Sequence, residues 1–462
     1  MFKLSSICTA SVILLQLPAA YAQSAPPAAG DMAARIDAAI APYFKPDAPG
    51  ASVIVVKDGK TVFRKGYGMA DVAKGIPMDA GAQHRIGSVT KQFTSTAILM
   101  LADEGKLSVD DDITKYLPDY PTNGKKITIE HLLTHTSGIV SYTSKPGFRA
   151  SIGTPLTVSG MIDTFKNDPL TFEPGSSYAY NNSGYFLLGA IIEKVSGMSY
   201  AQFVEKRIFM PLGMLDTAYE GHEKGKAPRA AGHTTTPAGF APSAQMSMTL
   251  PYAAGSIVST VDDMARWDAA VSSGKLLKAA SWQRAFTPYM LSTGKKTDYG
   301  YGWHIGTMQG TQRIAHGGGI PGFSAHAMRL PQEKVYVVVL ANNDRLPMST
   351  EVVAARAAAI AIGKPFPDLK PVAVAPEKLD EVAGAYQLDE KTVRTFTREG
   401  DKLFTQRGDR PKNEVVAYGV DRFFVPNTLV HMEFARDASG KVNAVTIHQM
   451  DDTQTGPRIA TK

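Results

Sequence analysis

Two groups of strand-forming residues lie far apart in this chain, and helical patterns fill the region between them. Residues 51–56 and 61–66 form the first group, a hairpin around a Lys-Asp-Gly-Lys turn. The second group consists of residues 324–330 and the nearly continuous apolar run 335–341. Strands joined by tight turns pair antiparallel. We therefore expect strands from both ends of this region to join one antiparallel sheet, with a helical insert between them.

Composition divides the chain into five segments. Residues 1–22 have the pattern of a signal peptide, and residues 23–33, rich in proline and alanine, predict a flexible lead-in. Residues 34–364 hold the predicted sheet and helices, and residues 365–376 are a proline-rich linker. In residues 377–462, short strand patterns alternate with turns, which predicts a small all-β domain resembling a β-barrel.

The first segment predicts export. Lys3 gives a positive start, an apolar run follows, and Ala20-Tyr21-Ala22 supplies a small-x-small cleavage pattern. A buried core helix is the alternative reading. The apolar run is too short to cross a bilayer, so no stable membrane span is expected after cleavage. The only cysteine, Cys8, would be lost with this segment, which excludes disulfides from the mature chain. The predicted location is periplasmic or secreted.

The charge pattern does not indicate a nucleic-acid partner. The formal net charge is +6, but no run of lysine and arginine is longer than two residues. Release of counterions from nucleic acid needs clustered cations, which this sequence lacks. Hydrophobic residues make up 44% and charged residues 20%, as in ordinary globular proteins with a substantial core. Such a dispersed, mildly basic surface is compatible with attraction to an anionic envelope polymer. A cell-wall peptide is a separate candidate partner.

Ser88-Val89-Thr90-Lys91 is a candidate nucleophile with its base. Residues three apart on a helix face the same way, so the Ser88 hydroxyl and the Lys91 amine can meet. A serine hydroxyl needs a neighbour that accepts its proton, and a lysine can accept it only when its pKa falls toward neutrality. The alternative is a helix-capping serine next to a surface lysine.

Two further motifs carry polar groups that suit the same chemistry. Tyr180-Asn181-Asn182 follows a Gly/Ser-rich stretch and precedes a helix, so the tyrosine could share the serine's proton. The alternative is a helix N-cap with an exposed tyrosine. His316 and the glycines Gly317, Gly318 and Gly319 stand directly before the late hairpin. Glycines let a substrate approach a strand closely, and an N–H there can join the Ser88 N–H in an oxyanion hole.

Ser-x-x-Lys, Tyr-x-Asn and a glycine-containing strand motif, in this order, resemble the signature of the serine β-lactamase and penicillin-binding-protein superfamily. The chain is most similar to the branch of class C β-lactamases, D-Ala-D-Ala carboxypeptidases, D-aminopeptidases and related esterases. Residues 435–449 resemble the lipocalin-like domains appended to such hydrolases. The similarity to the hydrolases spans about residues 45–345 and includes these segments: 87–116, 131–138, 174–189, 211–214, 254–267 and 299–303.

This resemblance implies an α/β (α+β) sandwich of the β-lactamase/transpeptidase type, with an antiparallel sheet flanked by helices and a helical subdomain. It implies that Ser88 attacks the substrate and that Lys91 and Tyr180 transfer protons. Asn182 would orient the substrate, and His316 would replace the usual lysine of the third motif. The proposed chemistry requires neither a metal nor an organic cofactor.

The histidine in the third motif favours some substrates over others. A lysine at that position presents a permanent cation to the carboxylate of a penicillin or of a peptide C-terminus, whereas a histidine is mostly neutral at pH 7. The first hypothesis is therefore an exported serine hydrolase acting on D-amino-acid peptides or small esters. The alternatives are a β-lactamase and a penicillin-binding sensor or scaffold with slow turnover. A third hypothesis is that the C-terminal domain binds a partner or covers the site.

Other motifs in the sequence lack the context that their functions need. Gly317, Gly319 and Gly322 have the spacing of a dinucleotide-binding loop, but no βαβ pattern precedes them. His131 and His135 have a zinc-like spacing, but Leu132 stands where a catalytic glutamate would be needed. Packing or local hydrogen bonding is the preferred interpretation of both histidines.

Overall fold

The computed structural model describes residues 29–460, so the predicted signal peptide lies outside the described residues. Its centre is a six-stranded antiparallel sheet in the order β10-β11-β12-β13-β1-β2. The expected pairing of early and late strands is confirmed, because Ala51 of β1 pairs with Ala341 of β13. The strands are β1 (Ala51–Lys57), β2 (Lys60–Tyr67), β10 (His304–Met308), β11 (Thr311–Ile320), β12 (Phe323–Leu330) and β13 (Val335–Ala341).

Each face of the sheet is buried under a different set of helices. Val337 and Val339 of β13 pack with the helices α1 (Ala29–Ile40) and α10 (Thr350–Ala361) in one core cluster. Val338 and Leu340, which alternate with them, pack with the helical region in a second cluster. This alternation explains the continuous apolar run, because both faces of the strand are covered.

The helical region lies between β2 and β10 in the sequence. Its longest helix is α5, in which every residue from Ser183 to Ile192 is buried. Short strands β5 and β9 pair beside the sheet and hold the segment that leads into α2. The helices are α2 (Thr90–Asp103), α3 (Ile129–Leu133), α4 (Val158–Asp163), α5 (Asn182–Ser196), α6 (Tyr200–Val204), α7 (Met210–Leu212), α8 (Val261–Ser272) and α9 (Ala279–Ala285). The short strands are β3 (Met69–Asp71), β4 (Ile76–Pro77), β5 (His84–Arg85), β6 (Ala218–Tyr219), β7 (His233–Thr236), β8 (Gly239–Pro242) and β9 (Ile257–Ser259).

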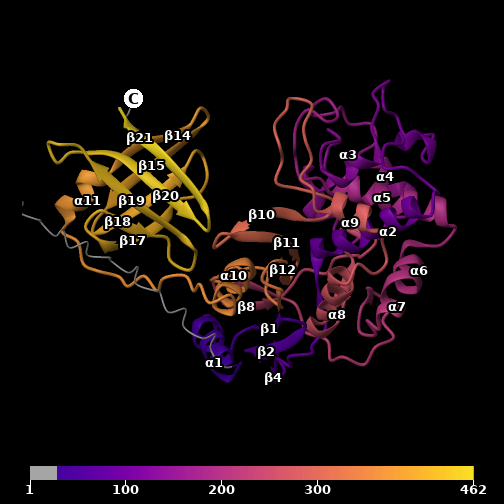
Figure 1. Cartoon of the computed structure of the whole chain (residues 1–462), viewed down its shortest axis with the longest axis horizontal. Helices are drawn as coiled ribbons and strands as arrows, with labels where there is room; N and C mark the ends of the chain where they lie inside the picture. Colours follow the sequence, from indigo (N-terminus) through magenta and orange to yellow (C-terminus); the bar gives the residue numbers. More distant parts are fainter. Residues whose placement is uncertain (1–28, 461–462) are drawn as a thin grey trace, which may run out of the picture.

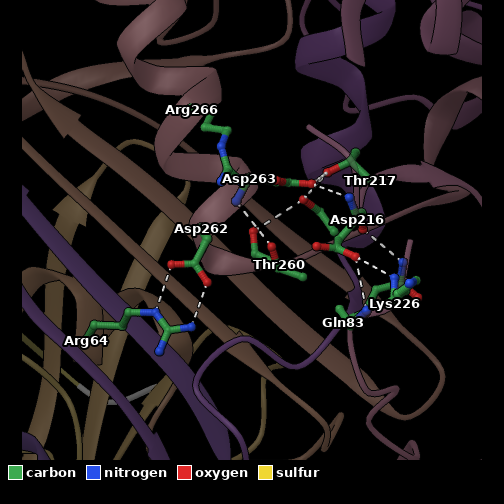
Figure 2. Close-up of polar contacts among 11 residues, drawn as sticks. Arg64, Gln83, Asp216, Thr217, Lys226, Thr260, Asp262, Asp263 and Arg266 are labelled. Carbon is green, nitrogen blue, oxygen red and sulfur yellow. Dashed lines mark hydrogen bonds and ion pairs between the residues drawn. The ribbon is translucent and has the colours of Figure 1, made fainter. Parts of the chain in front are cut away.

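A polar network fixes the start of α8 against the sheet and the neighbouring loop (Figure 2). Thr260 caps the helix by accepting the Asp263 N–H at 3.2 Å. The fully buried Asp263 carboxylate accepts the Thr217 hydroxyl at 2.8 Å. Asp262 and Arg64 of β2 form a bidentate ion pair, with nitrogen–oxygen distances of 2.8 and 2.7 Å. These contacts orient α8 so that its apolar face covers the sheet.

The C-terminal segment forms a closed antiparallel barrel of strands β14 to β21, as expected. Its interior is filled by packed side chains that include Tyr386, Phe396 and Phe434. Figure 1 shows this barrel on one side of strands β10–β12 and the helical region on the other. The elements are α11 (Pro376–Val382), β14 (Gly384–Asp389), β15 (Thr392–Glu399), β16 (Lys402–Arg407), β17 (Asn413–Gly419), β18 (Arg422–Phe424), β19 (Val430–Arg436), β20 (Val442–Gln449) and β21 (Asp452–Ile459).

Two predicted boundaries require correction. The lead-in predicted for residues 23–33 is not flexible throughout, because α1 begins at Ala29. Met32, Ile36 and Ile40 recur at intervals of four residues and bury one face of α1 against the sheet. The proline-rich linker ends one residue earlier than predicted, because Pro376 is the first residue of α11, a position that proline favours.

The barrel contacts the turn between β10 and β11 directly. The Asp451 carboxylate, in the turn between β20 and β21, accepts the backbone N–H groups of Gln309 and Gly310 at 2.7 and 2.9 Å. Met450 beside it packs against the core cluster shared with α1 and α10. β10 is an edge strand of the sheet, so this contact holds the outer hairpin at its turn. Within residues 29–460, no helix is long and apolar enough to span a bilayer.

Replacing Asp451 by alanine is expected to loosen this hairpin turn. Hydrogen bonds to a carboxylate contribute on the order of 1 kcal/mol or more, so exchange of the Gln309 and Gly310 amides should accelerate up to about tenfold. Hydrogen–deuterium exchange with peptide resolution measures this change. The neighbouring Asp452→Ala variant is the control, and equal protection in the Asp451→Ala protein and the unmodified protein would refute the contact.

Candidate active site

Ser88 lies in the turn directly before the buried helix α2. A 3-10 turn, Gly87–Val89, leads into the helix, and Gly87 has a φ of +50° that favours glycine. The Ile86 N–H donates to the Ile257 carbonyl at 3.0 Å, which fixes the approach of the chain to the helix. N–H groups in the first turn of a helix have no acceptor within that helix, so the Ser88 N–H points outward as a donor. Ser88 is half-buried and Lys91, one turn later, is fully buried.

The Lys91 amine has three hydrogen-bond partners among the described residues, and none of them is a carboxylate. Nζ lies 3.0 Å from Ser88 Oγ, 2.8 Å from Asn182 Oδ1 and 2.9 Å from the Ala254 carbonyl oxygen. Burial without a counterion lowers the pKa of Lys91 well below its ordinary value of 10.5. A neutral amine donates its two N–H groups to Asn182 and Ala254, because both are acceptors. Its lone pair then faces the Ser88 hydroxyl, which donates to it.

His135 positions Tyr180 beside the serine. The His135 carbonyl accepts the Ala179 N–H at 3.0 Å, and its Nδ1 accepts the Asn181 N–H at 3.1 Å. The His135 ring also packs on the Tyr180 ring, with centroids 4.3 Å apart. Desolvation of the Tyr180 hydroxyl raises its pKa above the ordinary value, and a hydrogen bond with Ser88 acts in the opposite direction. Tyr180 is therefore a neutral phenol at the serine, held by the loop on both sides.

Asn182 contacts Lys91 in a way that the sequence did not predict. Its Oδ1 accepts a Lys91 N–H, and its Nδ2 donates to the Thr143 hydroxyl at 3.1 Å. The Asn182 backbone N–H donates to Ser141 Oγ at 3.1 Å. Both ends of the side-chain amide thus have protein partners, and the residue orients the lysine. Its contact with a substrate stays a prediction.

His316 of β11 is buried and neutral. Its Nδ1 lies 2.6 Å from the Gly317 carbonyl, and its Nε2 lies 2.8 Å from the Tyr299 hydroxyl. Because a carbonyl only accepts, the proton is on Nδ1 and Tyr299 donates to Nε2. Burial, with smaller contributions from His304 and Lys91, lowers the pKa of His316 well below 6.5. Both ring nitrogens are therefore occupied, and the ring presents no cation to a substrate.

The glycines of β11 let two backbone segments meet at the nucleophile. β10 pairs only as far as Ala315, so the edge of β11 beyond it faces the turn that carries Ser88. A methyl group built on Gly318 would lie 2.0 Å from the Ile86 carbonyl oxygen. One built on Gly319 would meet nothing within 4 Å. Gly318 is therefore required for the close approach, and Gly319 lines open space.

The predicted residues converge on one cavity of about 350 Å³, lined by Ser88, Tyr180, His316 and Gly317 among others. Lys91 and Asn182 lie behind it, joined to Ser88 by hydrogen bonds. Their catalytic roles stay predictions, but the proximity that those roles need is present. Sequence reasoning missed Tyr299 and the positioning role of His135. His135 and Tyr180 are far apart in the sequence, and no residue pattern around His135 predicts their contact.

His131 and His135 each form a local hydrogen bond of their own. His131 Nδ1 accepts the Thr128 N–H at 3.2 Å in a capping box of α3, whereas His135 holds the Asn181 N–H. Local hydrogen bonding is thus confirmed for both. Within residues 29–460, no group of three or more His, Cys, Asp or Glu side chains is arranged to hold a metal ion.

Comparison with known proteins identifies the family. A family model described as Beta-lactamase matches residues 34–362. This chain belongs to the beta-lactamase family. It is 27% identical over 407 residues to a penicillin-binding protein of Bacillus subtilis (strain 168), covering 83% of this chain and 89% of that one. It is 29% identical to a D-aminopeptidase of Gluconobacter oxydans (strain 621H) over 72% of this chain and 63%, less than two thirds, of that one.

A solved relative supports the whole architecture. The octameric penicillin-binding protein homologue from Pyrococcus abyssi aligns with a TM-score of 0.66 and 26% identity, over 92% of this chain and 99% of that one. The beta-lactamase-type sheet with its flanking helices and the C-terminal barrel are therefore both present in this protein. As a member of this family the protein is a serine hydrolase, which agrees with the Ser88–Lys91 contact.

The beta-lactamase-family site predicts that Gly318→Ala is far more damaging than Gly319→Ala. The added methyl at 318 would force β11 away from the Ser88 turn, whereas the methyl at 319 enters open space. Loss of one oxyanion donor typically costs about a hundredfold in rate. The rate of labelling by a fluorophosphonate should fall by about that factor for Gly318→Ala only. Equal rates in both variants would contradict the geometry.

Burial of Lys91 also predicts how stability depends on pH. The unfolded lysine keeps its ordinary pKa of 10.5 and the folded one lies lower, so the unfolded chain binds one more proton between these two pKa values. Stability in that window should therefore rise with pH, by about 1.4 kcal/mol per pH unit from this group. Thermal unfolding over a pH series should show this gain in the unmodified protein relative to Lys91→Met. The control is Lys194→Met, which replaces an exposed lysine. If stability depended on pH in the same way in Lys91→Met and in the unmodified protein, the lowered pKa of Lys91 would be contradicted.

Proposed function

We propose that this protein is an exported serine hydrolase that cleaves amide bonds of D-amino-acid peptides or amides through an acyl-serine intermediate. The observation that carries the proposal is the contact between the fully buried Lys91 amine and the Ser88 hydroxyl, 3.0 Å apart. The D-aminopeptidase among the relatives supports the choice of D-amino-acid substrates. Small esters are a second group of acyl donors that the same nucleophile can attack.

Acylation begins with transfer of the Ser88 proton to Lys91 Nζ while Ser88 Oγ bonds to the substrate carbonyl carbon. The negative charge that forms on the carbonyl oxygen is stabilised by the Ser88 N–H and by an N–H of the β11 edge. Tyr180 then donates its hydroxyl proton to the leaving nitrogen and regains a proton from Lys91, while the carbon–nitrogen bond breaks. The acyl group stays on Ser88, and Lys91 is neutral again.

Deacylation uses the same groups in reverse. A water molecule bonds to the acyl carbon and gives its proton to the Tyr180–Lys91 pair. The Ser88–carbon bond breaks, and Ser88 Oγ takes the proton back. Because the pKa of Tyr180 is raised, the phenol stays protonated between these steps and donates rather than bearing a charge. The products are a D-amino acid and an amine, or the corresponding alcohol from an ester.

β-Lactam hydrolysis is the second candidate. The penicillin-binding protein among the relatives supports acylation of Ser88 by such compounds. A neutral His316 with both ring nitrogens occupied offers no cation to the β-lactam carboxylate, which favours slow turnover. Export rests on the sequence pattern of residues 1–22 and belongs to the proposal: the mature protein acts in the periplasm or outside the cell, where cell-wall peptides supply D-amino acids.

A panel of acyl donors tests this function. The protein and its Ser88→Ala variant are assayed with D-alanine amide, L-alanine amide, a p-nitrophenyl ester and a chromogenic cephalosporin. We expect turnover of the D-amide to exceed that of the L-amide, with a loss of at least about 1,000-fold in Ser88→Ala.

The other outcomes separate the alternatives. Turnover of the cephalosporin alone would replace the proposal with a β-lactamase. Persistent stoichiometric labelling by penicillin without turnover of any amide or ester would indicate a sensor. Mass-spectrometric mapping of the acyl group identifies the nucleophile, and modification at a residue other than Ser88 would refute the mechanism.

A further inference from the structure

The cavity at Ser88 continues past the nucleophile to a set of ionisable side chains that the mechanism does not use. Besides Ser88 and Tyr180, its walls include Arg313, Glu351 and His326. Arg313 is on β11, four residues before Gly317. Glu351 is in the first turn of α10, on the far face of the sheet. The cavity thus links the nucleophile to a charged group on the α10 side.

The path between these groups exists because residue 317 has no side chain. Residues 313, 315 and 317 alternate with His316 along β11, so they face α10 while His316 faces the helical region. Directly across the strand pair, Gly317 is aligned with His326 of β12. A methyl group on Gly317 would lie 3.4 Å from His326 Nδ1, and a larger side chain would fill the passage. Gly317 therefore opens the edge of the strand toward Arg313.

Arg313 is a cation with binding capacity left. Its Nη1 donates to Glu351 at 2.8 Å, which fixes the side chain, and 19% of that side chain is exposed. Its buried Nε has no partner among the described residues. The guanidinium group has five N–H donors, and one carboxylate partner uses only part of them. His316 is neutral and fully bonded, so Arg313 is the permanent cation on the wall of this cavity.

We propose that Arg313 binds a carboxylate on the leaving group of the substrate, in place of the lysine that the third motif lacks. The inference rests on the proposed serine hydrolase activity and adds its leaving-group preference. Four residues along a strand span about 13 Å, of which the long arginine side chain covers a part. The carboxylate therefore lies several bonds beyond the scissile bond, and Glu351 holds the guanidinium group in place to receive it.

Two pairs of substrates with equal leaving-group geometry test this inference. D-Alanyl-4-aminobenzoate is compared with D-alanyl anilide, and 4-acetoxybenzoate with phenyl acetate. Within each pair only the carboxylate differs. The measured quantity is the ratio of kcat/KM for the carboxylate to that for the neutral partner, in the unmodified protein and in Arg313→Gln. A charged hydrogen bond to a carboxylate corresponds to about ten- to a hundredfold, so the ratio should fall by that factor, mainly through KM.

Two further variants separate recognition from structural damage. Glu351→Gln keeps an oxygen that can accept the Arg313 hydrogen bond and removes only the competing charge, so its ratio should not fall. Arg356→Gln, on the same helix but outside this cavity, should leave the ratio unchanged. An unchanged ratio in Arg313→Gln, or equal losses for both members of each pair, would overturn the inference. The ester pair keeps the test separate from the proposed function: if the D-amides are inert but the esters react, the D-peptide assignment fails while the role of Arg313 is still measured.

Discussion

The function proposed for this protein depends on one buried amine, Lys91, which has no carboxylate partner among the described residues. Lys91 is enclosed by the turn before α2, by the start of α5 and by the Ala254 segment. Its partners are a hydroxyl, an amide oxygen and a backbone carbonyl. Removing an ammonium group from water is costly, and a nearby carboxylate would repay part of that cost by holding the proton on the lysine. The fold supplies none among the described residues. The amine is thereby available as a base for Ser88.

The rest of the architecture serves to bring three distant segments to that amine. The 3-10 turn before α2 contributes the serine, His135 holds the Tyr180 loop on two sides, and the unpaired edge of β11 lies along the Ser88 turn. Each segment is anchored elsewhere: α8 reaches α2 through the Trp267–Gln92 hydrogen bond of 3.0 Å, and the barrel holds the β10–β11 turn through Asp451. The strand to which we assign the oxyanion N–H also carries Arg313, so the proposed catalysis and the proposed recognition of the leaving group share one strand.

Much of this arrangement could be predicted from local patterns, because the responsible signals are local. Turn residues between apolar runs predicted the hairpin strands. The helical spacing of Ser88 and Lys91 predicted that their side chains meet. Contacts between distant segments leave no such signal. His135 was interpreted as a residue for packing or local hydrogen bonding, but its hold on Tyr180 was not predicted, because it depends on a left-handed backbone with φ of +61°. Asn182 was predicted to face the substrate, yet its amide oxygen faces Lys91. The start of α1 was missed because proline and alanine before it outweighed the spacing of Met32, Ile36 and Ile40.

The protonation state of Lys91 is the most direct test of this account. Lysines labelled with ¹³C at Cε are titrated by NMR, and the Lys91 signal is assigned by its absence from the Lys91→Met variant. Its chemical shift should change from that of an ammonium group to that of a neutral amine at a pH well below 10.5, the ordinary pKa of lysine. A Lys91 signal that stays protonated until about pH 10, as in an exposed lysine, would contradict the claim that Ser88 is activated by this amine.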